Sequence, residues 1–333
     1  MRKLFHLFFL FSAVSLFCAG WAFPADAVKG VPVKIAMGYI PNVQFAPYYV
    51  AVERGYFKDE NLDVTFDYGM STDIMSLVAQ GLVQFGISDG DQVILARDKG
   101  IPVKVVYSMY VKYPVGVVSL KEKGIATAQA LRGKTVGMPG PYGSNYIGLQ
   151  ILLASAGLGL RDIRAESIGY TQVESLLAGR VDAAAVFINN EPVVLAEMGK
   201  EVNLIEAYRV TPMVSAAVIV SDALISKNPD LVERFVRAVT NASAYVLTNR
   251  SAVMGMLKKH VPTLTDENAG INTKVLLASL ALWTDEDTER HGLGYTSDRD
   301  WEESIETLLS LGIVKKRLKP GDCFTGRFIL KKP

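Results

Sequence analysis

The sequence predicts an α/β fold with two lobes, in which each lobe is a mainly parallel sheet flanked by helices and two crossovers form a hinge. Three observations lead to this fold class. From residue 31 onwards, short β-forming runs alternate with amphipathic helical segments. A unit of helix, strand and polar loop occurs twice, at residues 72–91 and 171–192. No low-complexity linker interrupts the chain, so we expect two crossovers between the lobes, near residues 110–118 and 208–216.

The first residues have the layout of a secretory signal peptide, which we assign to residues 1–27. Two basic residues, Arg2 and Lys3, precede an apolar run from Leu4 to Phe17, and small residues follow it. This run is shorter than the roughly 20 residues that a membrane span needs. We therefore expect an exported protein that works in the periplasm or another extracytoplasmic compartment.

Two details of the N-terminus stay open. Cleavage after Ala22 or after Ala27 fits the small residues there. Cys18 could instead be the acylated residue of a lipoprotein, although the two residues before it are bulkier than such sites prefer. Without Cys18 the mature chain keeps only Cys323, so we expect neither an internal disulfide nor a thiolate zinc site.

The first lobe is expected to begin with residues 31–112 and to be completed by residues 213–333. Its strands are predicted from short β-rich or alternating apolar runs at 33–37, 62–66, 83–87, 103–108 and 215–221. Asn228 and Pro229 are typical of a helix start, with asparagine as the N-cap and proline in the first turn. Further helices are predicted at 252–260, 267–282 and 299–311.

Residues 113–212 are predicted to form the second lobe. Strands are expected at 135–138 and 181–187. A Gly/Pro-rich loop at 139–144 leads into a helix at 145–156.

Polar segments follow the predicted strands of both lobes, at residues 39–42, 88–92, 139–146 and 189–191. In open α/β sheets, ligands bind beyond the carboxyl ends of the strands. Two lobes whose strand ends face each other form a cleft that closes on a small molecule. These loops contain no Lys or Arg, which disfavours a strongly charged anion. We expect the ligand contacts to be Tyr39, Asn42, Asp89, Gly143, Ser144, Asn145, Tyr146, Asn190 and Glu191.

Two of these segments have both a structural and a functional interpretation. In residues 189–192, either asparagine could cap a helix in which Glu191 favours the dipole. Alternatively, the Glu191 carboxylate and a neighbouring amide could pair with the N–H and N edge of a pyrimidine-like ring. In residues 139–146, backbone N–H groups at a helix N-terminus could bind a ligand acceptor, or Ser144 could simply be the cap.

Catalytic and metal-binding patterns are missing from the sequence. His260 and His291 are the histidines outside the signal peptide, and neither lies in a ligand-type spacing such as HExxH. There is no GxSxG motif and no phosphate-binding loop. Asp89 and Asp91 could hold an amine or a metal, but a turn with an N-cap is the commoner role for such a pair. We expect no metal and no cofactor.

Composition and charge limit the partners. Lys and Arg total 35 against 34 Asp and Glu, so nothing favours nucleic acid. With 50% hydrophobic and 21% charged residues the chain is globular in composition, and we expect a monomer.

Four segments resemble one family, at residues 38–42 (GYIPN), 49–57 (YVAVERGYF), 189–192 (NNEP) and 300–305 (DWEESI). The family comprises solute-binding proteins related to the fungal thiamine-pyrimidine synthases, with binders of thiamine-precursor pyrimidines, riboflavin, taurine, sulfonates and nitrate. The resemblance extends over residues 33–315. It implies a type II periplasmic-binding-protein fold, a ligand in the interlobe cleft and the permease of an ABC importer as partner.

The same resemblance bears on catalysis and on the ligand. The family's enzyme branch has a histidine shortly after the Pro-Asn pair and a Cys-rich stretch. Here Phe45 stands where that histidine would align and no Cys cluster exists, so the resemblance implies a binding protein and disfavours a pyrimidine synthase. Residues 41–47 (PNVQFAP) are closer to riboflavin-type binders. The expected ligand is a small heterocyclic nutrient, riboflavin-like or a thiamine-precursor pyrimidine, with a taurine, sulfonate or nitrate binder as the alternative.

Overall fold

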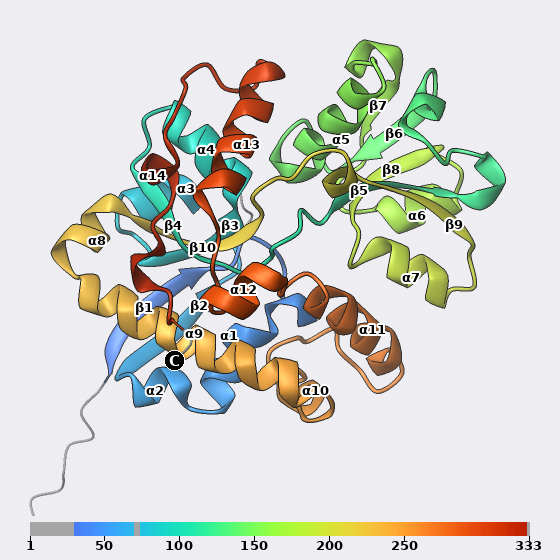
Figure 1. The fold of residues 1–333 in the computed structure, drawn as a ribbon. Coiled ribbons are helices and arrows are strands. Elements are labelled where there is room, and N and C mark those ends of the chain that lie inside the picture. Colours follow the sequence, from blue (N-terminus) through green and yellow to red (C-terminus); the bar gives the residue numbers. More distant parts are fainter. Residues whose placement is uncertain (1–29, 70–73, 332–333) are drawn as a thin grey trace, which may run out of the picture.

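The computed structural model describes residues 30–69 and 74–331, whose strands form two separate five-stranded sheets. Figure 1 shows the two sheets in two lobes, with the green and yellow segment forming the second lobe. The predicted signal peptide at residues 1–27 and Cys18 lie outside the described residues.

Both sheets have the same topology. The first has the order β2-β1-β3-β10-β4 and the second β7-β6-β8-β5-β9. The strands of the first sheet are β1 Val31–Ala36, β2 Leu62–Asp67, β3 Phe85–Asp89, β4 Val103–Ser108 and β10 Ala216–Ser221. Those of the second are β5 Val115–Leu120, β6 Thr135–Met138, β7 Arg164–Ser167, β8 Ala183–Phe187 and β9 Val202–Glu206.

One strand in each sheet runs against the other four. β1 pairs in parallel with β2 and β3, whereas β10 is antiparallel to β3 and β4. In the second sheet β6 pairs in parallel with β7 and β8, and β5 is antiparallel to β8 and β9. The reversed strands β5 and β10 are those that directly follow a crossover between the lobes. The predicted class, two mainly parallel sheets joined by two crossovers, is confirmed.

Helices cover both sheets. Those of the first lobe are α1 Ala46–Glu53, α2 Tyr56–Asp59, α3 Ile74–Ala79, α4 Gly90–Asp98, α8 Asp222–Lys227, α9 Pro229–Thr248, α10 Arg250–Leu257, α11 Ala269–Leu280, α12 Glu286–His291, α13 Asp298–Ser310 and α14 Pro320–Cys323. Those of the second lobe are α5 Gly143–Ser155, α6 Gln172–Leu177 and α7 Glu191–Glu197. Short 3-10 helices lie at Val43–Phe45, Lys121–Lys123, Ala128–Leu131, Leu160–Asp162, Ala207–Arg209 and Gly326–Phe328. Across residues 30–69 and 74–331, no helix combines the length and apolar character that a bilayer crossing requires.

The strands that the sequence did not predict are β5, β7 and β9. β7 and β9 are the two edges of the second sheet, and every residue of β7 is exposed. β7 has the sequence RAES and therefore lacks the apolar alternation that identifies a strand. β5 (VGVVSL) and β9 (VNLIE) are richer in apolar residues and were missed nonetheless. The start of α9 was predicted correctly, because the Asn228 side chain accepts a hydrogen bond from the Leu231 N–H at 3.2 Å.

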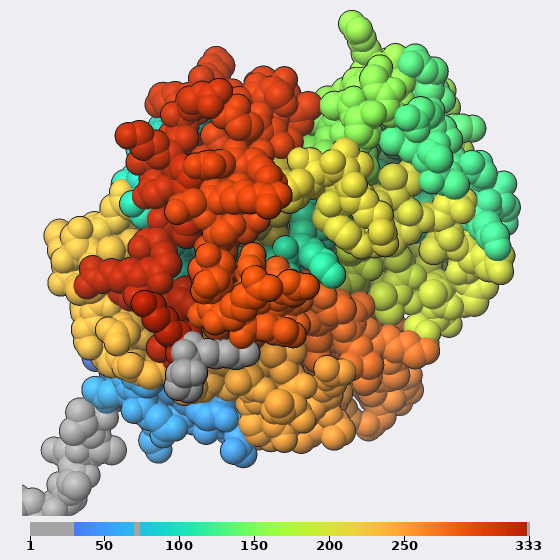
Figure 2. Space-filling model, in the orientation of Figure 1, coloured from blue at the N-terminus to red at the C-terminus, as the bar shows by residue number. Residues whose placement is uncertain are grey.

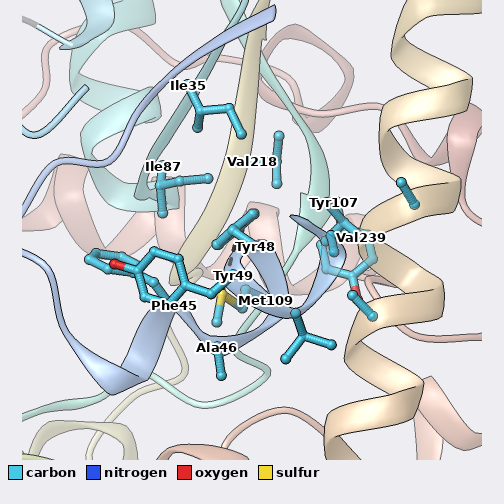
Figure 3. Close-up of a cluster of buried hydrophobic side chains, with 14 of the residues drawn as sticks. Ile35, Phe45, Ala46, Tyr48, Tyr49, Ile87, Tyr107, Met109, Val218 and Val239 are labelled. Carbon is cyan, nitrogen blue, oxygen red and sulfur yellow. Dashed lines mark hydrogen bonds between the residues drawn. The ribbon is translucent and has the colours of Figure 1, made fainter. Parts of the chain in front are cut away.

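The main core of the first lobe lies between its sheet and the helices α1 and α9. Figure 3 shows side chains of the sheet, such as Ile87 and Val218, above the fully buried ring of Tyr48 on α1. On the α9 side, Phe235 stacks on Phe85 of β3 with ring centroids 3.7 Å apart. This packing holds β3 rigidly, and β3 leads directly into one of the polar loops.

We expect Phe235→Ala to lower the free energy of unfolding by about 3–5 kcal/mol, because it leaves a cavity beneath β3. Urea denaturation followed by circular dichroism measures this change. Asn241→Ala, at an exposed position of the same helix, is the control and should change stability by less than about 0.5 kcal/mol. Equal losses in the two variants would contradict the assigned core.

Candidate functional site

The loops at the carboxyl ends of the strands meet across the two lobes. Ser144 at the start of α5 bonds to Asp89 at the end of β3, with an oxygen–oxygen distance of 2.7 Å. The rings of Tyr39, after β1, and Tyr170, before α6, make an edge contact with centroids 5.3 Å apart. Loops at the strand ends of the two lobes are therefore in direct contact.

One group of polar side chains, which we call the two-aspartate cluster, comprises Asp89, Asp91, Tyr113 and Ser144. The Ser144 Oγ lies 2.7 Å from Asp89 Oδ2 and 2.9 Å from Asp91 Oδ1. The Tyr113 hydroxyl lies 2.6 Å from Asp91 Oδ2 and 2.9 Å from the Ser144 carbonyl oxygen. The aspartates belong to the first lobe, whereas Ser144 belongs to the second.

Of the two roles considered for this segment, the helix cap does not apply to Ser144. Tyr142 occupies the N-cap position of α5, and Ser144 is the second residue of the helix. Its hydroxyl therefore points away from the helix end and across to the other lobe. Left-handed backbone at Gly143, with φ of 71°, makes this sharp entry into α5 possible and favours glycine there.

The two-aspartate cluster is unusual because, among the described residues, no cationic group offsets its charge. The side-chain hydrogen bonds to these carboxylates come from neutral groups, namely Ser144, Tyr113 and Gln92. Burial, together with the neighbouring charge of Asp91, raises the pKa of Asp89. Burial also raises the pKa of Asp91. The closed cluster therefore favours a bound proton.

A second connection between the lobes is made by Asn189, which is only 1% exposed. Its Nδ2 donates to Ser279 Oγ at 2.8 Å and to Gln44 Oε1 at 3.0 Å, and both acceptors belong to the first lobe. Its Oδ1 is buried without a hydrogen-bond partner among the described residues. Asn190, one of the two residues predicted as a possible cap, occupies the N-cap position of α7, but its side chain makes no cap bond.

Glu191 is the first residue of α7 and is 9% exposed. Its Oε2 accepts a hydrogen bond from the Phe187 N–H at 3.0 Å, and its Oε1 lies 3.4 Å from Asn190 Nδ2. Burial raises the pKa of Glu191 to about 7. Burial also raises the pKa of the Tyr39 phenol to about 12, with a further contribution from the charge of Glu191. Glu191 thus closes a local turn and also faces a tyrosine of the other lobe.

The remaining residues predicted as ligand contacts occupy the same region. Asn42 begins a 3-10 helix and accepts a hydrogen bond from the Gln44 N–H at 3.0 Å. Asn145 is 5% exposed, and its Oδ1 has no hydrogen-bond partner in the described chain. Tyr146 lies within α5, inside the helix predicted at residues 145–156.

Several residues of the interlobe contact were missed or not selected from the sequence. Asp91 had a signal, because it follows β3 just as Asp89 does. Gln44, Tyr113 and Ser279 had none, because each lies far along the chain from the residue it contacts and only the fold brings them together.

Two further features of this region involve none of the predicted ligand contacts. Lys274 of α11 pairs with Glu197 of α7, and Figure 2 shows the orange atoms of α11 against the yellow-green second lobe. A pocket of about 150 Å³ is lined by both crossovers and includes Tyr110, Tyr208 and Asp300, but none of the predicted contact residues. Among residues 30–69 and 74–331, no three His, Cys, Asp or Glu side chains are arranged to hold a metal ion.

Comparisons with known sequences identify a family. The profile of the family described as NMT1/THI5 like matches residues 42–252. The riboflavin-binding protein RibY of Chloroflexus aurantiacus is 34% identical over 300 residues, covering 89% of this chain and 86% of that protein. The formylaminopyrimidine-binding protein of Halalkalibacterium halodurans is 28% identical, covering 83% of this chain and 84% of the relative. A 4-amino-5-hydroxymethyl-2-methylpyrimidine phosphate synthase of Aspergillus parasiticus is 26% identical, with coverage of 85% and 83%.

Solved structures show the same architecture. The periplasmic aliphatic sulphonate binding protein SsuA of Escherichia coli superimposes with a TM-score of 0.71 at 13% identity, covering 91% of this chain and 94% of that one. The alkanesulfonate-binding protein SsuA of Xanthomonas axonopodis pv. citri has a TM-score of 0.68 at 14% identity, with coverage of 89% and 99%. At these identities the likeness establishes the periplasmic-binding-protein fold alone.

We expect Asn189→Ala to shift the ligand-free protein towards a more open arrangement of the lobes. The change removes two interlobe hydrogen bonds worth about 1 kcal/mol each, so the ratio of open to closed molecules should rise roughly tenfold or more. Small-angle X-ray scattering should detect a larger radius of gyration. Asn203→Ala is the control, because Asn203 bonds only within the second lobe, to the Lys121 carbonyl. An unchanged radius for Asn189→Ala would argue against this contact as a closure element.

Proposed function

The chain belongs to the NMT1/THI5-like family, and from this premise we propose that it is the extracytoplasmic solute-binding component of an ABC importer. It binds a small heterocyclic nutrient between its lobes and delivers it to the permease. The observation that carries this proposal is the bonding of strand-end loops across the lobes, above all between Ser144 and Asp89. A site shared by two lobes closes when one ligand touches both of them.

We favour riboflavin or a closely similar flavin as the ligand, with a thiamine-precursor pyrimidine as the second candidate. The relative that is 34% identical is named a riboflavin-binding protein, and another binds a formylaminopyrimidine. The site chemistry agrees, because Glu191 and the free Oδ1 of Asn145 are acceptors suited to the ring N–H of such heterocycles. Tyr39 and Tyr170 offer aromatic surfaces for a flat ring.

A sulfonate or nitrate ligand fits the site less well. The loops that meet between the lobes contain no Lys or Arg, and the carboxyl groups of Glu191 and Asp89 are buried there. An anion would have to displace water next to acceptors without gaining a cation. The likeness to sulfonate-binding proteins is a likeness of fold.

We propose that the protein binds its ligand without catalysing a reaction. Phe45 stands where the resemblance to the enzyme branch places a histidine, and it is 9% exposed and packed edge-on against Tyr49. A phenyl ring cannot donate atoms or protons to a product. The two cysteines of the full chain are Cys18 and the buried Cys323, so no Cys cluster exists. The relatives named as synthases, at about a quarter identity, make the enzyme the less favoured alternative.

The remaining assignments complete this proposal. Residues 1–27 direct export and are removed, and the mature protein acts as a monomer outside the cytoplasm. Residues 31–112 and 213–333 form one lobe and residues 113–212 the other, so that closure presents both lobes to the permease.

We expect purified protein to quench riboflavin fluorescence with saturable, one-to-one binding. Flavin mononucleotide should bind at least about tenfold more weakly, because its phosphate would approach buried carboxyl groups. Formylaminopyrimidine, taurine and nitrate complete the panel. Tight binding of taurine or nitrate with no response to either heterocycle would overturn the proposed ligand class, and formation of a pyrimidine product by the protein would overturn the assignment as a binding protein.

Glu191→Ala should weaken riboflavin binding about 10- to 100-fold, because it removes a buried acceptor for the ring N–H. Calorimetry measures the affinity, and an unchanged melting temperature excludes unfolding as the cause. Glu166→Ala is the matched control, since Glu166 lies in the same lobe, on the edge strand β7, and is exposed. An affinity equal to that of the unmodified protein would remove Glu191 from the site.

A further inference from the structure

The two-aspartate cluster contains more close contacts than it has hydrogens when both carboxylates are ionised. Ser144 has one hydroxyl hydrogen, yet its Oγ lies 2.7 Å from Asp89 and 2.9 Å from Asp91. The Tyr113 hydroxyl donates its hydrogen to the other carboxylate oxygen of Asp91, with an oxygen–oxygen distance of 2.6 Å. One added proton on Asp89 removes the shortage at Ser144: Asp89 donates to Ser144, Ser144 donates to Asp91, and Tyr113 donates to Asp91. The second contact of the Tyr113 hydroxyl, to the Ser144 carbonyl oxygen at 2.9 Å, does not depend on this proton.

Among the described residues around the cluster, no cationic side chain offsets the charge of the two carboxylates. The titratable groups set against it are phenols: Tyr113, and Tyr110 on the segment after β4, which interacts with Asp89. Gln92 of α4 is neutral and lies 3.2 Å from Asp91. The Trp301 ring of α13 packs close to Gly90, between the two aspartates. Two adjacent buried carboxylates without a cation repel each other, and both have a raised pKa.

We propose that closure of the lobes takes up one proton at the two-aspartate cluster, with Asp91 and Tyr113 as positioning residues that hold Ser144 in place. The inference rests on the proposed function in that it assumes lobes that open and close. On opening, Ser144 moves away with the second lobe and both carboxylates meet water. They then ionise as ordinary aspartates, and the proton is released.

The sign of the pH effect follows from this difference in bound protons. The closed form keeps a proton at pH values where the open form has lost it, so acidification favours closure and tightens ligand binding. With one proton taken up, affinity rises by at most about tenfold for each pH unit lowered, and the effect ends below the aspartate pKa of the open form.

The test measures proton uptake during riboflavin binding, by calorimetry at pH 7 in buffers of different ionisation enthalpy. In Asp91→Asn the side-chain amide supplies the missing hydrogen to Ser144, which then donates to Asp89, so no proton is needed. The unmodified protein should take up more protons than Asp91→Asn, by up to about one. Glu191→Gln is the control for the other buried carboxyl group, and the difference caused by Asp91→Asn should persist in that background. Equal uptake with and without the Asp91→Asn change would overturn the proposal.

A second measurement separates this proposal from the identity of the ligand. Small-angle X-ray scattering of the ligand-free protein between pH 8.5 and 5.5 should show compaction as pH falls, and Asp91→Asn should show less of it. Both proteins are also measured with Glu191→Gln, because the Glu191 carboxyl, with a pKa of about 7, titrates in the same range. If riboflavin fails to bind but this difference appears, the proposed ligand is wrong and the proton-linked closure stands. If both proteins respond identically to pH, the closure proposal fails whatever the ligand. Circular dichroism at each pH confirms that Asp91→Asn remains folded.

Discussion

Two sheets can share one small molecule only when the loops at their carboxyl ends face each other, and this constraint determines where the polar residues of the site lie. Each sheet has a single reversed strand, β5 or β10, and each directly follows a crossover. The crossovers thereby bring equivalent loops of the two lobes into opposition. Hydrogen bonds from Ser144 to Asp89 and from Asn189 to Gln44 then join the loops directly.

The chemistry of the resulting site is dominated by buried acceptors. Glu191, Asp89 and the unpaired Oδ1 of Asn145 lie where no basic side chain of the loops can reach them. We expect such a site to favour a ligand that carries N–H or O–H donors, because unpaired buried acceptors are unfavourable. The same shortage of positive charge makes the carboxyl groups sensitive to protons. The proposed ligand preference and the proposed pH sensitivity therefore have one physical origin.

The sequence was sufficient for the architecture and for the polar loops that meet between the lobes, but not for the contacts among those loops. Apolar runs identified the strands of the first sheet and β6 and β8 of the second, because burial imposes a regular pattern. β7 (RAES) is an exposed edge strand and carries no such pattern. A helix cap was one of the two roles considered for Ser144 and Asn189, because capping is the usual role of such residues at that spacing. Their actual partners lie 55 and 145 residues away along the chain, and only the packing of the lobes creates those contacts.

The central claim is that one heterocyclic ligand binds between the two lobes, in contact with the strand-end loops of both. A crystal structure of the protein grown with riboflavin tests it most directly. The account predicts a flat ring between the Tyr39 loop of the first lobe and the start of α7 in the second, with a ring N–H within hydrogen-bond distance of Glu191. Riboflavin bound to one lobe alone, or lodged at a distance from these loops, would contradict it.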